Sequence, residues 1–89
     1  MNKYTVVWSQ KSKKQLKKMD KTESLLIVDW VKRNLEGIEN PRSIGRTLKG
    51  NLAGYWRYKV GDYRVIVLID DEAVIIQVVS AGHRKEIYE

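Results

Sequence analysis

One stretch of the sequence decides the fold: YWRYKVGDYRVIVLI, residues 55–69. On both sides of Gly61-Asp62 the residues are rich in β-branched and aromatic types, a pattern typical of two strands joined by a tight turn. Successive side chains of a strand point to opposite faces, so Arg57 and Lys59 share one face and Trp56 lies on the other. Another strand is expected at 73–80, after an acidic turn at 70–72.

The N-terminal part of the chain predicts a strand followed by a helix. Residues 4–8, YTVVW, predict one strand. Ser9 follows as a plausible N-cap, and Leu16 and Met19 give the next helix a thin apolar stripe with lysines facing outward. The N-terminal part of the chain is therefore expected to run from a strand into a lysine-rich helix.

A second helix is expected from Asp20 or Thr22, either of which can cap it, to a stop at Gly37. Its stripe at helical spacing consists of Leu25, Leu26, Val28, Asp29, Trp30, Val31 and Leu35. The two helices are expected to form an antiparallel hairpin. Asn40-Pro41 ends the helical pattern, and residues 41–53 are expected to form a linking segment that can hold one helical turn.

The resulting order, β-α-α-β-β-β, predicts a two-layer α+β domain in which a helix hairpin packs on a small antiparallel sheet. At 89 residues the chain has room for a single domain, residues 1–89. The expected core joins the sheet to the second helix, and the three tryptophans are expected to belong to it. Its members would be Val65, Val67, Ile69, Ile75, Ile76 and Val78 against Leu25, Val28, Val31 and Leu35, with Trp8, Trp30 and Trp56. The other face of the sheet can stay concave and solvated.

Composition excludes several kinds of protein. The sequence holds no cysteine, which excludes disulfides, thiolate catalysis and cysteine-based zinc sites. No apolar run approaches the roughly 18 residues that a membrane span needs, and the N-terminus does not resemble a signal peptide. We therefore expect a cytoplasmic protein that does not contact membranes.

Positive charge is the strongest bulk property. The formal net charge is +6, and residues 1–19 hold six lysines and no acid. Residues 42–64 hold a second group of cations, with Asp62 as the one acid among them. Clustered cations attract polyanions, so a nucleic acid or the ribosome is a candidate partner; a solubilising surface is the alternative.

Four cations are expected to ring one end of the sheet: Arg57, Lys59, Arg64 and Arg84. Two cations on one face of a strand repel each other, and an anion between them removes that cost. The alternative is an edge strand that its cations protect from aggregation.

The C-terminal run HRKEIY, residues 83–88, adds His83 and Tyr88 to this end of the sheet. Histidine has an ordinary pKa near 6.5 and transfers protons readily at neutral pH. A tyrosine among cations has a lowered pKa and can serve as a base, or it can stay neutral and stack on a nucleobase. Either residue is thus a candidate for proton transfer.

Two segments together carry a family resemblance. Residues 48–66, with the pattern L-K-G-x-x-x-G-x-W-R-Y-x-V-G-x-Y-R, resemble the central segment of the RelE/ParE toxin superfamily. Residues 82–88, GHRKEIY, resemble the C-terminal motif of its RelE branch. The spacing between the two segments and the order of the elements agree with that family, so the resemblance covers essentially the whole chain.

The resemblance implies the toxin of a type II toxin–antitoxin system, an endoribonuclease that cleaves messenger RNA in the ribosomal A site. The RNA's own 2′-hydroxyl attacks the adjacent phosphate, so neither a metal nor another cofactor is needed. The site residues that the resemblance implies are Arg57, Lys59, Arg64, Arg84 and Tyr88, to which we add His83 as a candidate.

Roles for these residues follow from the chemistry. Arg64 and Arg84 can clamp the non-bridging phosphate oxygens, and Arg57 can stabilise developing charge. Lys59 is a candidate partner for the nucleophile or its base. Many relatives carry lysine in place of Arg57, and His83 stands where relatives often have another basic residue, so the general base is either His83 or Tyr88.

Two other functions remain open. A ParE-like toxin poisons DNA gyrase by binding and needs no cluster of Arg64, Arg84 and Tyr88. A catalytically inactive relative would bind only its antitoxin and, through it, operator DNA.

Partners follow from the same resemblance and charge. We expect a RelB-like antitoxin, acidic and partly disordered, that covers the concave face or the helix hairpin and displaces RNA, and contact with operator DNA only through the antitoxin complex. The ribosome and messenger RNA are the expected targets. The cations expected to hold ribosomal RNA are Lys11, Lys13, Lys14, Lys17, Lys18, Arg46 and Lys49.

Overall fold

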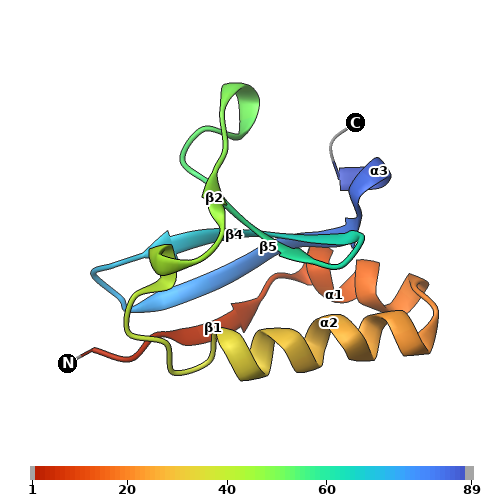
Figure 1. Cartoon of the computed structure of the whole chain (residues 1–89), viewed down its shortest axis with the longest axis horizontal. Helices are drawn as coiled ribbons and strands as arrows, with labels where there is room; N and C mark the ends of the chain where they lie inside the picture. The colour runs from red at the N-terminus through yellow and green to blue at the C-terminus, as the bar shows by residue number, and fades with distance from the viewer. Residues whose placement is uncertain (1, 88–89) are drawn as a thin grey trace.

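The computed structural model describes residues 2–87, which form three helices and one five-stranded sheet (Figure 1). The strands are β1 (Thr5–Trp8), β2 (Arg46–Thr47), β3 (Trp56–Val60), β4 (Tyr63–Asp70) and β5 (Ile75–His83). The helices are α1 (Gln10–Lys18), α2 (Lys21–Asn34) and α3 (Arg84–Ile87). Across the sheet the strands lie in the order β1-β5-β4-β3-β2.

The sheet is mixed, and the prediction of a purely antiparallel sheet is wrong in one pairing. β3, β4 and β5 form the predicted antiparallel meander, but β1 lies parallel to β5, with Thr5 opposite Ile75 and Trp8 opposite Val78. The two helices between β1 and the meander supply the crossover that a parallel pair requires. The α+β class with a β-α-α-β-β-β core order is confirmed.

The segment 41–53 holds more structure than the predicted link. Two short 3₁₀ turns, Pro41–Ser43 and Gly50–Leu52, flank the two-residue strand β2. Strand β2 pairs with β3 through Arg46 opposite Arg57 and Thr47 opposite Trp56, so it forms the outer edge of the sheet.

Both helix starts follow the sequence. Ser9 caps α1 as predicted, because its hydroxyl oxygen accepts a hydrogen bond of 3.1 Å from the backbone N–H of Ser12. Asp20 stands at the N-cap position of α2 without a side-chain cap bond.

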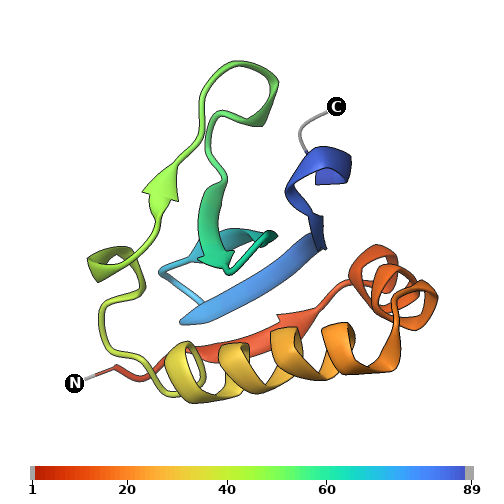
Figure 2. The same ribbon diagram turned by 45° about the vertical axis from the view of Figure 1, so that its right-hand side comes forward.

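The predicted pair of helices is present, but α1 is seen nearly end-on in Figure 2 while α2 runs across the view. The helices therefore cross and do not lie side by side.

Helix α1 also completes the hydrogen bonding of β5, which extends further along the sheet than its neighbour β1. The Gln15 side chain accepts from the backbone N–H of Ala81 at 2.9 Å and donates to the Ser80 hydroxyl at 3.0 Å. The fully buried Ser12 hydroxyl donates to the carbonyl of Val78 at 3.1 Å. These polar side chains thus take the place of a strand at an edge that would otherwise be open.

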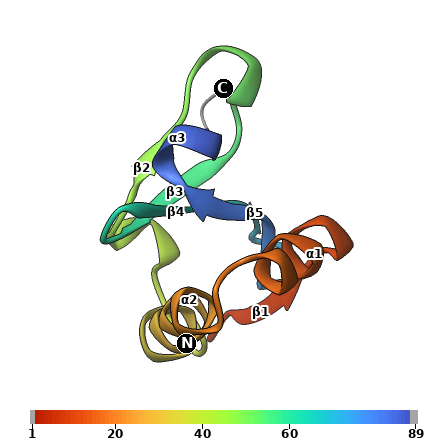
Figure 3. The same cartoon turned by 90° about the vertical axis from the view of Figure 1, so that its right-hand side faces the viewer.

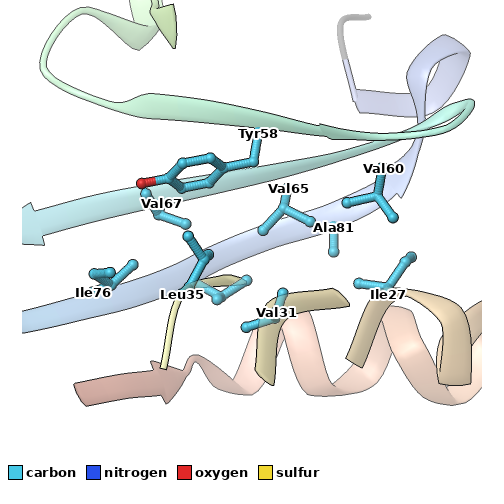
Figure 4. Close-up of a cluster of buried hydrophobic side chains, with 10 residues drawn as sticks. Ile27, Val31, Leu35, Tyr58, Val60, Val65, Val67, Ile76 and Ala81 are labelled. Atoms are coloured by element: carbon cyan, nitrogen blue, oxygen red, sulfur yellow. The ribbon is translucent and has the colours of Figure 1, made fainter. Parts of the chain in front are cut away.

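The core lies between α2 and one face of the sheet (Figure 4). Its buried members are Ile27, Val31, Leu35, Tyr58, Val60, Val65, Val67, Ile76, Val78 and Ala81. The three tryptophans pack against this cluster, as predicted. Three expected members are not in it: Val28, Ile75 and Leu25, which is 57% exposed. Ile27 takes the place expected for Leu25, since α2 carries four apolar residues in a row at 25–28 and spacing alone cannot say which one faces inward.

The opposite face of the sheet, called here the open face, carries no long helix. Figures 1 and 3 show α1 and α2 on one side of the sheet, and α3 with the loop around residues 48–55 on the other. Val7 and Leu68 lie on this face and stay about two-fifths exposed, at 42% and 40%. No helix among residues 2–87 is long and apolar enough to cross a membrane.

Val74 lies in the turn between β4 and β5 with φ of 57°, a left-handed conformation that is unfavourable for a β-branched residue. Val74→Gly is expected to raise the free energy of unfolding by about 0.5–1 kcal/mol, because relief of the strain exceeds the added entropy of the unfolded chain. Urea unfolding measures the change. The matched control is Ala73→Gly in the same turn, which should not stabilise. Equal effects of the two substitutions would contradict the strain.

Candidate functional site

Four cations gather on the open face at the β2–β3–β4 edge, and they are called here the cation row: Arg46, Arg57, Lys59 and Arg64. Arg46 lies opposite Arg57, and Lys59 lies opposite Arg64. Residues directly opposite each other share a face, and like charges in such pairs cost roughly 0.2–1 kcal/mol each. A bound anion would remove this repulsion, so the row is a candidate site for a polyanion.

The outer edge of β3 brings three of these cations around one pocket. Arg46, Arg57 and Lys59 line a pocket of about 380 Å³ together with Trp30, Asn34, Ile44, Gly45 and Tyr58. None of these lining residues is acidic. The sequence placed Arg46 with the general RNA-binding cations, whereas β2 pairing brings it next to Arg57.

Arg64 is built into the sheet to an unusual degree for an arginine, since only 8% of the residue is exposed. Its Nη1 atom donates to the carbonyl oxygens of Gly61 at 3.0 Å and Tyr63 at 2.9 Å, which fixes the guanidinium over the β3–β4 turn. Its Nε atom is buried and has no hydrogen-bond partner among residues 2–87. A buried donor without a partner is costly, so the Nε edge of Arg64 suits an oxygen ligand.

Arg84 stands at the start of α3, close to Arg64. Its backbone N–H donates to the carbonyl of Asp62 at 3.0 Å, which ties α3 to the same β3–β4 turn that holds Arg64. Gly82, two residues earlier, lies directly opposite Arg64. The backbone of Arg84 thus lies beside the turn that joins Lys59 to Arg64, and the Arg84 side chain is exposed.

His83 is not in a C-terminal tail, since it is the last residue of β5, and it lies on the other face of the sheet from Arg64. It pairs with Tyr63, whose ring meets the imidazole edge-on at a centroid distance of 5.8 Å. A β-bulge opposite Ile66 and Val67 places one extra residue in β5. The bulge reverses the alternation beyond it, so Ala81 and His83 face the helices while Gly82 faces the open side. The structure therefore does not bring His83 together with the cation row.

On the helix-facing side, Tyr63 and His83 line a pocket of about 310 Å³ with Lys18, Asp20, Glu23 and Glu86. The Tyr63 hydroxyl donates a hydrogen bond to the Glu23 carboxylate on α2. This bond, assisted by burial, raises the pKa of Tyr63 to about 12. Sequence patterns did not reveal this pair, because its members are forty positions apart.

The raised pKa of Tyr63 gives a testable pH dependence. The folded-state pKa, about 12, exceeds the ordinary value of 10.0, so stability from the protonated phenol is complete below pH 10 and is lost as the pH rises toward 12. Tyr63→Phe should therefore flatten the decline in unfolding free energy above pH 10, measured by urea titration, and Glu23→Gln should do the same. If the unfolding free energy of Tyr63→Phe fell above pH 10 as steeply as that of the unaltered chain, Tyr63 would not be the group responsible.

The remaining candidates fall into two groups. Tyr88 lies outside the described residues. The cations predicted to hold ribosomal RNA are exposed: Lys11, Lys13, Lys14, Lys17 and Lys18 on α1, Arg46 on β2, and Lys49 just before the second 3₁₀ turn.

A further pocket on the open face was not predicted. It measures about 310 Å³ and is lined by Lys11, Leu52, Tyr55, Ile66, Val79, Ser80 and Ile87. Ile66 lies opposite Arg57 and two residues from Arg64, so this largely apolar pocket borders the cation row. Its walls come from the loop around 48–55 and from α3, two segments that only the tertiary fold brings over one surface.

Comparison with known proteins agrees with this architecture. Residues 6–88 match the family described as the ParE toxin of the type II toxin–antitoxin system parDE. The chain is 28% identical to toxin RelG of Mycobacterium tuberculosis over 85 residues, which cover 96% of this chain and 95% of that protein.

Solved structures give the same picture. The chain resembles a chain of the toxin–antitoxin complex RelBE2 from M. tuberculosis with a TM-score of 0.83 and 27% identity, over 94% of both chains. A variant of Escherichia coli RelE in the free state has a TM-score of 0.73 at 22% identity, over 96% of this chain and 87% of that one, which shows a shared fold. The family match over nearly the whole length shows that the chain belongs to the ParE toxin family of the RelE/ParE superfamily, the toxins of type II toxin–antitoxin systems.

Proposed function

We propose that this toxin is a ribosome-dependent endoribonuclease that cleaves messenger RNA in the A site without a metal ion. The observation that carries the proposal is the geometry of Arg64. The residue is nearly buried, two carbonyls fix its guanidinium, its Nε has no hydrogen-bond partner among residues 2–87, and Lys59 lies opposite it. Such preorganised charge suits a phosphate whose negative charge grows in the transition state.

In the proposed reaction the 2′-oxygen of one nucleotide forms a bond to the adjacent phosphorus, and the bond from phosphorus to the 5′-oxygen of the next nucleotide breaks. Arg64 and Arg84 hold the non-bridging oxygens, and Arg57 stabilises the added charge. Lys59 lies opposite Arg64 and assists the nucleophile or its base. A general base takes the proton of the 2′-hydroxyl, and the leaving 5′-oxygen gains a proton; Tyr88 is the proposed base.

Two neighbouring surfaces suit the rest of the substrate. The pocket lined by Leu52, Tyr55 and Ile87 borders the cation row and offers an aromatic ring to a nucleobase. The exposed lysines of α1 supply sequence-independent contacts to ribosomal RNA.

For the same cations we propose a second ligand, an acidic antitoxin encoded with this toxin. The similar M. tuberculosis structure is a toxin–antitoxin complex, and no acidic residue among 2–87 lines the pocket formed by Arg46, Arg57 and Lys59. An acidic segment over this pocket would exclude RNA. Its affinity should fall as salt rises from about 0.1 to 0.5 M, because screening weakens such contacts. A salt-independent affinity in calorimetry would contradict an electrostatic cover.

The family description favours one alternative, inhibition of DNA gyrase as a ParE toxin. That activity requires binding and no phosphate chemistry, so it gives no reason for a buried Arg64 whose Nε has no partner within residues 2–87. We therefore rank it second.

The proposed chemistry can be tested with one atom. Ribosomes are loaded with a short message that is either all ribonucleotide or carries a single 2′-deoxynucleotide at the cleaved position. We expect cleavage of the first message only, with a 2′,3′-cyclic phosphate on the upstream fragment. Equal cleavage of both messages would rule out attack by the 2′-hydroxyl.

A further inference from the structure

His83 accepts a backbone hydrogen bond in this structure, although its side-chain chemistry suggests proton transfer. Its Nδ1 atom accepts a hydrogen bond of 3.2 Å from the backbone N–H of Lys85. Lys85 is the second residue of α3, and the first N–H groups of a helix have no partner within the helix. The imidazole thus satisfies one of them, as the side chain of an asparagine or serine N-cap does.

The imidazole is itself held in place. Its ring meets the Tyr63 ring edge-on, and Tyr63 is anchored to Glu23 on α2 through its hydroxyl. The chain of contacts therefore runs from the large helix α2, through Tyr63 and His83, to the first turn of α3.

This cap matters for the candidate site because α3 carries Arg84. Arg84 is its first residue, and its backbone N–H is bonded to Asp62 in the turn below Arg64. At the other end of α3, Ile87 packs over Gly82: a Cβ added at Gly82 would lie 3.3 Å from the Ile87 Cδ1 atom. Position and direction of this short helix thus depend on few contacts, and the His83 cap is one of them.

We infer that His83 is a positioning residue, which fixes the first turn of α3 so that Arg84 stays beside Arg64, and that it does not transfer the proton. This inference rests on the proposed nuclease function. The geometry favours it for two reasons: His83 faces away from the cation row, and its Nδ1 lone pair is already engaged by Lys85.

Three substitutions separate a cap from a base. Asparagine places an acceptor oxygen close to the position of Nδ1, whereas the glutamine acceptor reaches further and alanine has none. None of the three side chains can act as a base at neutral pH. We expect His83→Asn to keep single-turnover cleavage of ribosome-bound message within about threefold, while His83→Gln and His83→Ala lose about tenfold or more.

Backbone order gives a second readout that needs no activity. ¹⁵N relaxation should give order parameters for residues 84–87 that fall in His83→Ala and His83→Gln and remain high in His83→Asn. Thermal unfolding checks that all variants are folded.

Two results would overturn the inference: His83→Asn as inactive as His83→Ala, which would identify a base, or unchanged order parameters in all three variants, which would remove the cap. An unaltered chain that leaves ribosome-bound message intact would instead refute the proposed function, and with it the positioning of Arg84, while the order parameters still decide whether His83 caps α3.

Discussion

Arg64→Ala is expected to lower the single-turnover rate of message cleavage on the ribosome by about a hundredfold or more, the usual cost of removing one preorganised donor from a transition state. Arg64 as a residue is 8% exposed, the Gly61 and Tyr63 carbonyls fix its guanidinium, and its Nε has no hydrogen-bond partner among the described residues. These contacts hold the charge in place before the substrate arrives, so its loss should affect the chemical step more than binding.

Because Arg64 also supports the β3–β4 turn, two further variants separate catalysis from folding. Arg64→Lys keeps the charge and loses the fork geometry, so an intermediate rate is expected. Arg84→Ala removes an exposed side chain and should reduce the rate at least about tenfold with the unfolding free energy unchanged. A folded Arg64→Ala variant that cleaves within threefold of the unaltered chain would remove Arg64 from the site.

Gly45→Ala is expected to destabilise the fold by at least about 3 kcal/mol, a large part of the stability of a small domain. Gly45 has φ of +81°, and an added Cβ would lie 2.4 Å from the Arg57 carbonyl oxygen and 2.6 Å from the Trp56 Nε1 atom. That indole nitrogen donates to the carbonyl of Ile44 at 2.8 Å, so the segment before β2 cannot move away without losing this bond. Displacing it would also disturb Arg46 in the cation row.

Gly37 provides the matched control, since it has the same φ of +81° and open space around the added Cβ. Gly37→Ala should cost only the conformational strain, about 1–2 kcal/mol. Urea unfolding of both variants measures the difference. Similar losses in the two would show that the close approach of Gly45 to β3 carries no energetic weight.

Local patterns were sufficient for much of the fold. Alternation around Gly61-Asp62 predicted the β3–β4 hairpin, and Ser9 caps α1 through the hydroxyl that the sequence offered. Val31 and Leu35 are buried as the helical spacing of α2 predicts. These features depend on residues within a few positions of each other, where propensity and periodicity are informative.

Features that depend on distant partners were missed. The parallel pairing of β1 with β5 joins residues seventy positions apart, and the edge contacts of Gln15 depend on where β1 ends. The bulge in β5 determines which face of the sheet His83 lies on, and no local sequence pattern predicts that bulge. Strand alternation was enough to place Arg57 and Lys59 on one face, but it could not show that Arg64 is nearly buried or that His83 lies on the helix-facing side of the sheet.

Cleavage of translated message by this toxin can be measured in cells. The chain is induced in bacteria that carry a reporter gene with its start codon either intact or replaced, and the 5′ ends of both transcripts are mapped while chromosomal DNA is examined for breaks. We expect new ends inside codons of the translated transcript, none in the untranslated one, and intact DNA. Growth arrest with both transcripts whole and the DNA broken would contradict cleavage of translated message and would indicate that the toxin acts on DNA gyrase.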